Sequence, residues 1–280
     1  MVTKVWQECN WLQALEGGID TAHAPILHRR ISETTTRPGI SINTNLVKGE
    51  PPRLEVDRTD YGYRYAGIRD IGDKGNLIRG YHYVMPFHQL RPLQFGLQGQ
   101  EPRQLIAGHV WVPMDDEHIS VFQYSLSTDT PFTDEQRAMA NISPEKLLRV
   151  KYKFEDGSVV DTWQPERQLH NDFLIDREMQ RVDNYTGIAS GREQDMAMTD
   201  TMGAIGDRTK EHLGTSDTAI ISGRRILLRM ARELQEGIEP YAPSHPEVFA
   251  VRAIDVVDTQ GDFFKLLEKQ SELGKAQPIS

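Results

Sequence analysis

The sequence predicts an α+β protein built around an antiparallel sheet. Two observations lead to this fold class. Strand-like segments follow one another between residues 40 and 126 without intervening helices, which argues against a doubly wound parallel sheet. Helix-like segments lie outside this region, before residue 23 and after residue 190. With 280 residues, the chain is long enough to bury a large core.

Composition narrows the class of protein. The chain has 32 lysines and arginines against 41 acidic residues, so its net charge is -9, and no basic stripe suggests a nucleic-acid partner. No segment approaches the roughly 20 apolar residues that span a bilayer, and no secretory signal is visible, so we expect a cytoplasmic protein without membrane contact. The single cysteine, Cys9, excludes intrachain disulfides and metal sites that need several thiolates. Any metal must be held mainly by histidines and carboxylates.

The first expected element is a helix over residues 10–22. Asn10 is a suitable N-cap, and the following apolar positions recur at helical spacing. One helical stripe contains Leu12, Leu15, Ile19 and His23.

Two strand pairs are expected next. Residues 61–68 alternate between aromatic and small or polar side chains, a glycine-rich turn follows, and residues 77–84 return as the second strand of a hairpin. Residues 103–112 and 118–126 form another pair around an acidic turn.

The region 127–170 is polar and interrupted by three prolines. It contains a short expected helix at 143–145 and an expected strand at 148–154. Because it has too few apolar residues for a core of its own, we interpret it as an insertion on the sheet. The chain is therefore expected to form a single domain over residues 1–280, with a tail from about residue 241.

Two helices close the main body. Ser190 and Glu193 fit a capping box, in which each side chain satisfies a backbone donor of the other, and the helix is expected to reach Leu213. The second helix is expected to begin near Asp217 and to stop at Gly237.

The chemically informative segment contains His23 and His28. Five residues apart, they would lie about 140° apart on a continuous α-helix. Pro25 breaks or kinks the helix between them, so that both side chains can turn toward one point. The alternative is two unrelated histidines, one in the core and one at the surface.

Asp195 is the candidate carboxylate. It lies inside the expected helix and shares a face with Met198 and Met202, and a carboxylate on an apolar face is costly unless it is paired or binds a metal. An ion pair with Arg192 or Arg208 is the alternative. Two histidines and one carboxylate would form the facial triad of non-haem Fe(II) oxygenases.

Several motifs, in order, resemble the catalytic domain of Rieske non-haem iron oxygenases, and most closely the phthalate dioxygenase group of oxygenase subunits. The resemblance covers roughly residues 6–235. Its motifs are NWLQALEGGIDTAH at 10–23 with His28, WVPMDD at 111–116, NDFLIDR at 171–177, QDMAM at 194–198 and DRTKEHLG at 207–214.

This resemblance implies a helix-grip fold, similar to START and Bet v 1 proteins, in which an antiparallel sheet wraps around long helices. It implies Fe(II) bound by His23, His28 and Asp195, and a catalytic role for Asp20, which links an iron ligand to the cluster of a neighbouring subunit in a homotrimer. The implied reaction is ring dioxygenation, hydroxylation or O-demethylation of an aromatic acid with O2. Electrons come from NAD(P)H through a reductase and a Rieske cluster.

The sequence departs from the family in one respect. Family members begin with a Rieske domain that holds a 2Fe-2S cluster through Cys-x-His and Cys-x-x-His, and no such motif is present here. The cluster is therefore expected either in trans or in a missing N-terminal region. A second departure is Glu16, where many members carry an asparagine near the iron.

Two other functions remain open from the residues. A 2-oxoglutarate-dependent oxygenase would use His170 and Asp172 with a distant third ligand, His212 or His245. A non-catalytic ligand-binding protein would keep the helix-grip pocket without its cluster domain. His82 and His88, which flank a strand, are weaker candidates for substrate contact.

Overall fold

The computed structural model describes residues 1–31, 51–95, 103–127, 130–139 and 148–267. It divides into two compact units. The first contains residues 1–18, 23–39 and 109–211, and the second contains residues 19–22, 40–108 and 212–280. Strand β6 (Arg103–Pro113) contributes its first half to the second unit and its second half to the first.

The sheet of the first unit has the strand order β1-β7-β6. Strand β1 (Val2–Gln7) pairs antiparallel with β7 (Ile119–Leu126). A tight turn joins β6 to β7, in which the Met114 N–H donates to the His118 carbonyl at 2.9 Å. The expected strand pair around an acidic turn is confirmed.

The described residues of this unit form five short α-helices. They are α1 (Trp11–Ile19), α2 (Ala24–Leu27), α3 (Asp134–Met139), α4 (Arg177–Val182) and α5 (Gly191–Asp200). The last residue of α1, Ile19, belongs to the second unit. Two expected boundaries are wrong. Helix α1 ends at Ile19 instead of residue 22, and α5 ends at Asp200 instead of Leu213. After α5 the backbone of Gly203 has φ +88°, a left-handed conformation that stops an α-helix.

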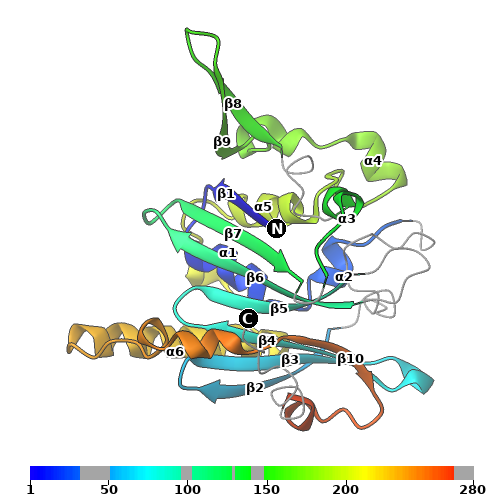
Figure 1. Ribbon diagram of the computed structural model, residues 1–280, viewed down its shortest axis with the longest axis vertical. Coiled ribbons are helices and arrows are strands. Elements are labelled where there is room, and N and C mark those ends of the chain that lie inside the picture. The colour runs from blue at the N-terminus through cyan, green and yellow to red at the C-terminus, as the bar shows by residue number, and fades with distance from the viewer. Residues whose placement is uncertain (32–50, 96–102, 128–129, 140–147, 268–280) are drawn as a thin grey trace. The chain divides into compact units, whose positions relative to one another are not determined.

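The expected insertion contains a separate hairpin of β8 (Arg149–Lys153) and β9 (Val159–Pro165) (Figure 1). The expected strand at 148–154 is therefore confirmed. The expected helix at 143–145 lies outside the described residues. Trp163 of β9 packs against β1, because the Lys4 ammonium lies 5.5 Å from its ring centre.

The sheet of the second unit has the strand order β6-β5-β4-β3-β2. Its strands are β2 (Arg53–Thr59), β3 (Gly62–Asp70), β4 (Asn76–Val84) and β5 (His88–Phe95). The expected hairpin is confirmed, because β3 and β4 pair antiparallel over their whole length. Strand β10 (Ile254–Asp258), which the sequence analysis missed, pairs antiparallel with the first half of β4.

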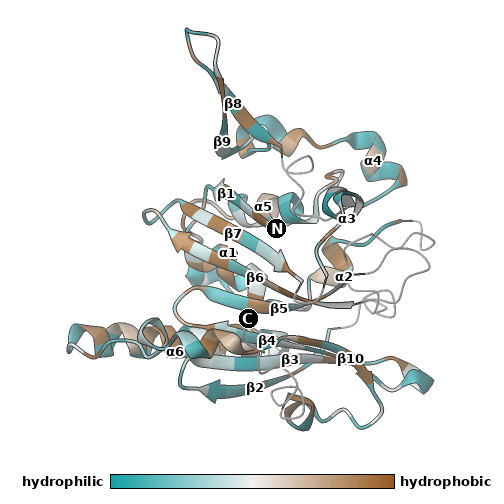
Figure 2. Ribbon diagram, viewed as in Figure 1, coloured by the Kyte–Doolittle hydropathy of each residue, from teal (hydrophilic) through white to brown (hydrophobic). Residues whose placement is uncertain are grey.

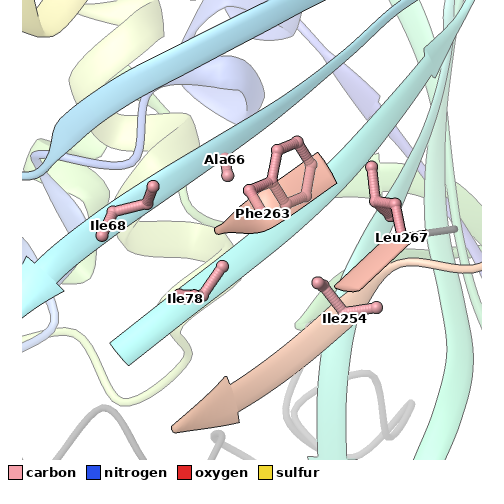
Figure 3. Close-up of a cluster of buried hydrophobic side chains, with 6 residues drawn as sticks. All are labelled: Ala66, Ile68, Ile78, Ile254, Phe263 and Leu267. Atoms are coloured by element: carbon pink, nitrogen blue, oxygen red, sulfur yellow. The ribbon is translucent and has the colours of Figure 1, made fainter. Parts of the chain in front are cut away.

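An apolar core lies on one face of β3 and β4 (Figure 3). It contains the buried side chains of Ala66, Ile68, Ile78, Ile254, Phe263 and Leu267. The tail thus supplies Phe263 and Leu267 to this core. On the other face, α6 (Thr218–Gln235) packs along β2 and β3. A Cβ at Gly223 would lie 2.9 Å from the Tyr63 hydroxyl, so this close approach requires glycine.

Helix α6 carries both hydrophobic and hydrophilic residues along its length (Figure 2). Its buried residues lie in the first half, whereas Leu228 and Leu234 in the second half are exposed. Among the described residues, no helix combines the length and the hydropathy needed to cross a bilayer. The α+β class with an antiparallel sheet is confirmed, and the helix-grip arrangement stays a prediction.

Candidate metal centre

His23 and His28 flank the short helix α2. His23 directly precedes it, His28 directly follows it, and Pro25 lies in its first turn, where its missing N–H costs nothing. The expected chain break is present, but it precedes Pro25. The Asp20 carboxylate accepts the Ala22 N–H at 2.7 Å, and such a side-chain bond competes with continuation of a helix.

Asp195 is presented by the middle of α5. Ser190 caps this helix, with its hydroxyl accepting the Glu193 N–H at 3.5 Å. Only this half of the expected capping box forms. The Glu193 carboxylate instead accepts the Leu148 N–H at 3.2 Å and pairs with Arg167 at 3.0 Å. Burial raises the pKa of Glu193 to about 7 despite this arginine.

The three candidate ligands converge within the first unit. The Nε2 atoms of His23 and His28 lie 3.4 and 3.1 Å from the same atom, Oδ1 of Asp195. The two imidazole rings are 5.4 Å apart and nearly perpendicular. Among the described residues this is the one group of three or more potential ligands whose donor atoms all lie within 4.8 Å of one another.

The expected alternative partners of Asp195 make their hydrogen bonds to other residues. Arg208 donates to Glu16 at 2.5 Å, and Arg192 donates to Gln7 at 3.1 Å. Burial raises the pKa of Asp195, but the two histidines outweigh it and hold this pKa well below its ordinary value. The carboxylate is therefore ionised and faces two imidazoles.

Gln194, the residue before Asp195, holds the ring of His28 in place. Its Oε1 lies 2.6 Å from Nδ1 of His28, and its Nε2 donates to the Ile188 carbonyl at 2.7 Å. This leaves Nε2 of His28 facing Asp195. The sequence analysis did not single out Gln194, although its place next to the candidate carboxylate in the QDMAM motif was a signal.

The donor set fits a divalent transition metal. Two imidazole nitrogens and one carboxylate oxygen are the ligands of the facial triad that suits non-haem Fe(II). The side chains of His23, His28 and Asp195 are 27%, 18% and 34% exposed, so a small molecule can reach the donor atoms. The His28 Nε2 atom and the Asp195 Oδ1 atom lie 3.1 Å apart, a separation at which one cation can contact both as neighbouring ligands.

A buried polar network joins α5 to β1. The Arg192 side chain is buried and donates to Gln7, and Gln7 also bonds to Thr199. Cys9 is buried, and burial raises the pKa of its thiol to about 12, so it is an inert residue and no ligand. At the end of α5, burial raises the pKa of Asp200 to about 6.

The other sequence candidates belong to different surroundings. Asp20 is half-buried, and its carboxylate bonds locally to Ala22. His82 and His88 lie in the second unit, where Nδ1 of His82 is 2.7 Å from the Tyr61 hydroxyl and the His88 ring packs on Phe249 at 5.0 Å. Their role in substrate contact stays a prediction.

The residues of the 2-oxoglutarate alternative do not form a metal-type group in the described part of the chain. His170 and Asp172 lie in a 3-10 helical turn of the first unit. His245 stacks on Tyr241 and bonds to Glu247 at 2.8 Å in the second unit.

Comparison with known proteins supports the resemblance seen in the sequence. The chain is 32% identical over 250 residues to the oxygenase subunit of phthalate 4,5-dioxygenase from Pseudomonas putida, which covers 84% of this chain and 52% of that protein. It is also 32% identical over 236 residues to the oxygenase subunit of 3-chlorobenzoate-3,4-dioxygenase from Comamonas testosteroni, covering 81% and 51%. Among solved structures, the Pseudomonas putida CBB5 NdmA QL mutant with theobromine has a TM-score of 0.46 and 14% identity, covering 94% of this chain and 58% of that one.

The expected similarity to phthalate dioxygenase oxygenase subunits is thus confirmed. The chain spans about half the length of the relatives that it matches. The family described as LigXa C-terminal domain like matches residues 1–277. Because that match includes almost every residue, the protein belongs to the LigXa C-terminal domain-like family.

Proposed function

We propose that this chain is the catalytic, mononuclear-iron part of an oxygenase that acts on aromatic compounds. The observation that carries the proposal is the convergence of two imidazole nitrogens on one carboxylate oxygen. In a chain related to aromatic dioxygenase subunits, this donor set is suited to Fe(II) held by His23, His28 and Asp195. When bound, Fe(II) on such a triad supplies open positions for O2 and substrate.

The residues of this chain have separate tasks in that centre. Asp195 supplies the negative charge, because its low pKa keeps it ionised at any physiological pH. His28 would supply a nitrogen donor through Nε2, and its ring is held through Nδ1 by Gln194. The buried Arg192 and Gln7 hold α5 from the side opposite solvent.

The proposed substrate is an aromatic acid. The names of two relatives specify phthalate and 3-chlorobenzoate, which both carry a carboxylate on an aromatic ring, and a third relative is the oxygenase subunit of a 5,5'-dehydrodivanillate O-demethylase from Sphingobium. We propose insertion of oxygen into such a ring or O-demethylation of such an acid. The two units would together form the single catalytic domain, folded as a helix grip in a cytoplasmic homotrimer.

Electrons would come from outside the metal site. We propose NAD(P)H as their source, delivered through a reductase and a 2Fe-2S Rieske cluster. Asp20, three residues before His23, would link the cluster side to the iron ligand. Asp20→Asn is therefore expected to keep iron and substrate binding but to stop NADH-driven turnover with a Rieske partner. Turnover near the wild-type rate would instead make Asp20 a local backbone cap, the role in which its carboxylate bonds to Ala22.

Hydrogen peroxide provides the test that needs no partner. It carries both the oxygen atom and the two reducing equivalents, so an aromatic C–H and peroxide give a phenol and water. The iron-loaded chain is expected to form product from peroxide with at least one of a panel of benzoates, phthalates and methoxylated aromatic acids. Asp20→Asn should retain this reaction and His28→Ala should lose it. An iron-loaded chain without product from the whole panel would favour a non-catalytic ligand-binding protein.

A further inference from the structure

Gln194 makes two hydrogen bonds that connect the backbone before α5 to a proposed iron ligand. Its side-chain Nε2 donates to the Ile188 carbonyl at 2.7 Å, and its Oε1 lies 2.6 Å from Nδ1 of His28. The residue is only 1% exposed, so water does not replace either partner readily.

These two contacts determine where the imidazole proton lies. A backbone carbonyl can only accept, so the amide nitrogen of Gln194 must face Ile188 and its oxygen must face His28. An amide oxygen also only accepts, and Nδ1 of His28 must therefore carry the hydrogen. In the neutral ring, the lone pair is then at Nε2, the atom that lies 3.1 Å from Asp195 Oδ1.

We propose that Gln194 is a positioning residue that holds His28 in its Nδ1–H tautomer and directs Nε2 toward the metal. The inference rests on the proposed iron site and adds a residue to it. Gln194 and Asp195 are consecutive on α5, so one turn of helix presents the carboxylate to Nε2 of His28 and the amide to Nδ1. A fixed tautomer removes the need to reorient the ring when a metal binds.

Metal affinity tests this role with matched variants. Gln194→Met removes both hydrogen bonds at similar volume, whereas Gln194→Glu keeps an acceptor for Nδ1–H and loses only the donor to Ile188. Gln13 is the control, because it is equally buried on α1 and bonds to the carbonyl of Gly203 and the N–H of Gly206 without touching either histidine. We expect Gln194→Met to weaken Fe(II) binding about 10- to 100-fold in anaerobic competition with a chelator.

Gln194→Glu and Gln13→Met are expected to bind Fe(II) within a few-fold of the wild-type affinity. Wild-type affinity in Gln194→Met would overturn the proposal. Equal losses in Gln194→Met and Gln13→Met would also overturn it, because they would show a general effect of lost packing.

The Nδ1 proton of His28 provides a second readout that needs no metal. In the metal-free protein labelled with 15N-histidine, NMR should show a proton on Nδ1 of His28 that exchanges slowly with water, because Gln194 accepts it. Gln194→Met should make this proton exchange faster. An Nδ1 of His28 without a proton in the wild-type protein would contradict the proposal even if Gln194→Met did not fold. By contrast, wild-type protein that shows this proton but binds no iron would refute the proposed function and leave the positioning of His28 intact.

Discussion

Two pairs of histidines in this chain have opposite environments. His23 and His28 of the first unit are partly exposed, and both direct Nε2 at one carboxylate oxygen. His82 of the second unit is 4% exposed and uses both ring nitrogens, with Nδ1 near the Tyr61 hydroxyl and Nε2 at 3.0 Å from the Arg252 carbonyl. Burial lowers the pKa of His82 to about 4 and that of His88 to about 4.

The difference teaches what distinguishes a ligand from a structural histidine. Burial alone produces a neutral imidazole, as at His82, but the neighbouring hydroxyl and carbonyl occupy its two nitrogens. At His28 one nitrogen is held by Gln194 and the other faces a carboxylate at a distance that a metal can bridge. The arrangement of partners around both nitrogens therefore carries more information than exposure.

The largest expected effect is the loss of metal binding when one of the three candidate ligands is removed. His23→Ala, His28→Ala and Asp195→Ala should each abolish the binding of about one iron per chain, because two donors are too few for a stable site. His82→Gln should retain full iron content. Metal analysis after anaerobic loading and desalting measures both. Stoichiometric iron in Asp195→Ala would rule out the carboxylate as a ligand.

Local patterns predicted much of this fold and site. The hairpin of β3 and β4 follows from alternation and turn residues, which are both local signals. The His23 and His28 pair was visible because Pro25 disfavours a continuous helix through both, although the break itself lies before Pro25. The convergence of Asp195 with both histidines joins segments more than 160 residues apart. The residues alone made this triad one of two alternatives, and the family resemblance favoured it.

Other features depend on tertiary contacts that the sequence does not display. Strand β10, which pairs with β4, comes from the tail and has only five residues, so its sequence signal is weak. Glu193 was expected to complete a capping box, but a long-range pair with Arg167 takes its carboxylate. Gln194 was missed because its positioning role depends on two hydrogen bonds, to the Ile188 carbonyl and to the His28 ring, that only the folded structure brings together.

A second prediction concerns how the stability of the folded protein depends on pH through His82. The folded-state pKa of His82 is about 4, below its ordinary value of 6.5, so between these pH values the unfolded chain binds a proton that the folded protein does not. Stability is therefore lost as pH falls from about 6.5 to 4. For His82 this amounts to about 3 kcal/mol, at 1.36 kcal/mol per pKa unit.

Urea unfolding at several pH values measures this contribution. In His82→Gln, the fall in the free energy of unfolding between pH 6.5 and 4 should be smaller by about 3 kcal/mol than in the wild-type protein. The variant loses hydrogen bonds at every pH, so the informative quantity is the slope and not the absolute stability. An unchanged slope would show that His82 is protonated in the folded state, and the contrast between the two pairs would fail.

The smallest expected effect concerns the pH dependence of stability and follows from a comparison of two carboxylates on α5, Asp195 and Asp200. At Asp195 the histidines dominate and the pKa is low, whereas at Asp200 burial dominates and raises the pKa to about 6 from 3.8. Above pH 3.8 the unfolded chain releases a proton that the folded protein keeps until about pH 6. Stability is therefore lost as pH rises from about 4 to 6, and the loss then stays constant.

Asp200→Asn removes this titration. Relative to the wild-type protein, its free energy of unfolding should gain up to about 3 kcal/mol between pH 4 and pH 7, because 2.2 pKa units correspond to that amount. Asp207→Asn is the control, since Asp207 is exposed and its pKa is lowered by hydrogen bonds from Thr209, so that variant should show no gain. If Asp200→Asn kept the wild-type pH dependence, the buried carboxylate would be ionised like Asp195. Burial would then not distinguish the two carboxylates of α5.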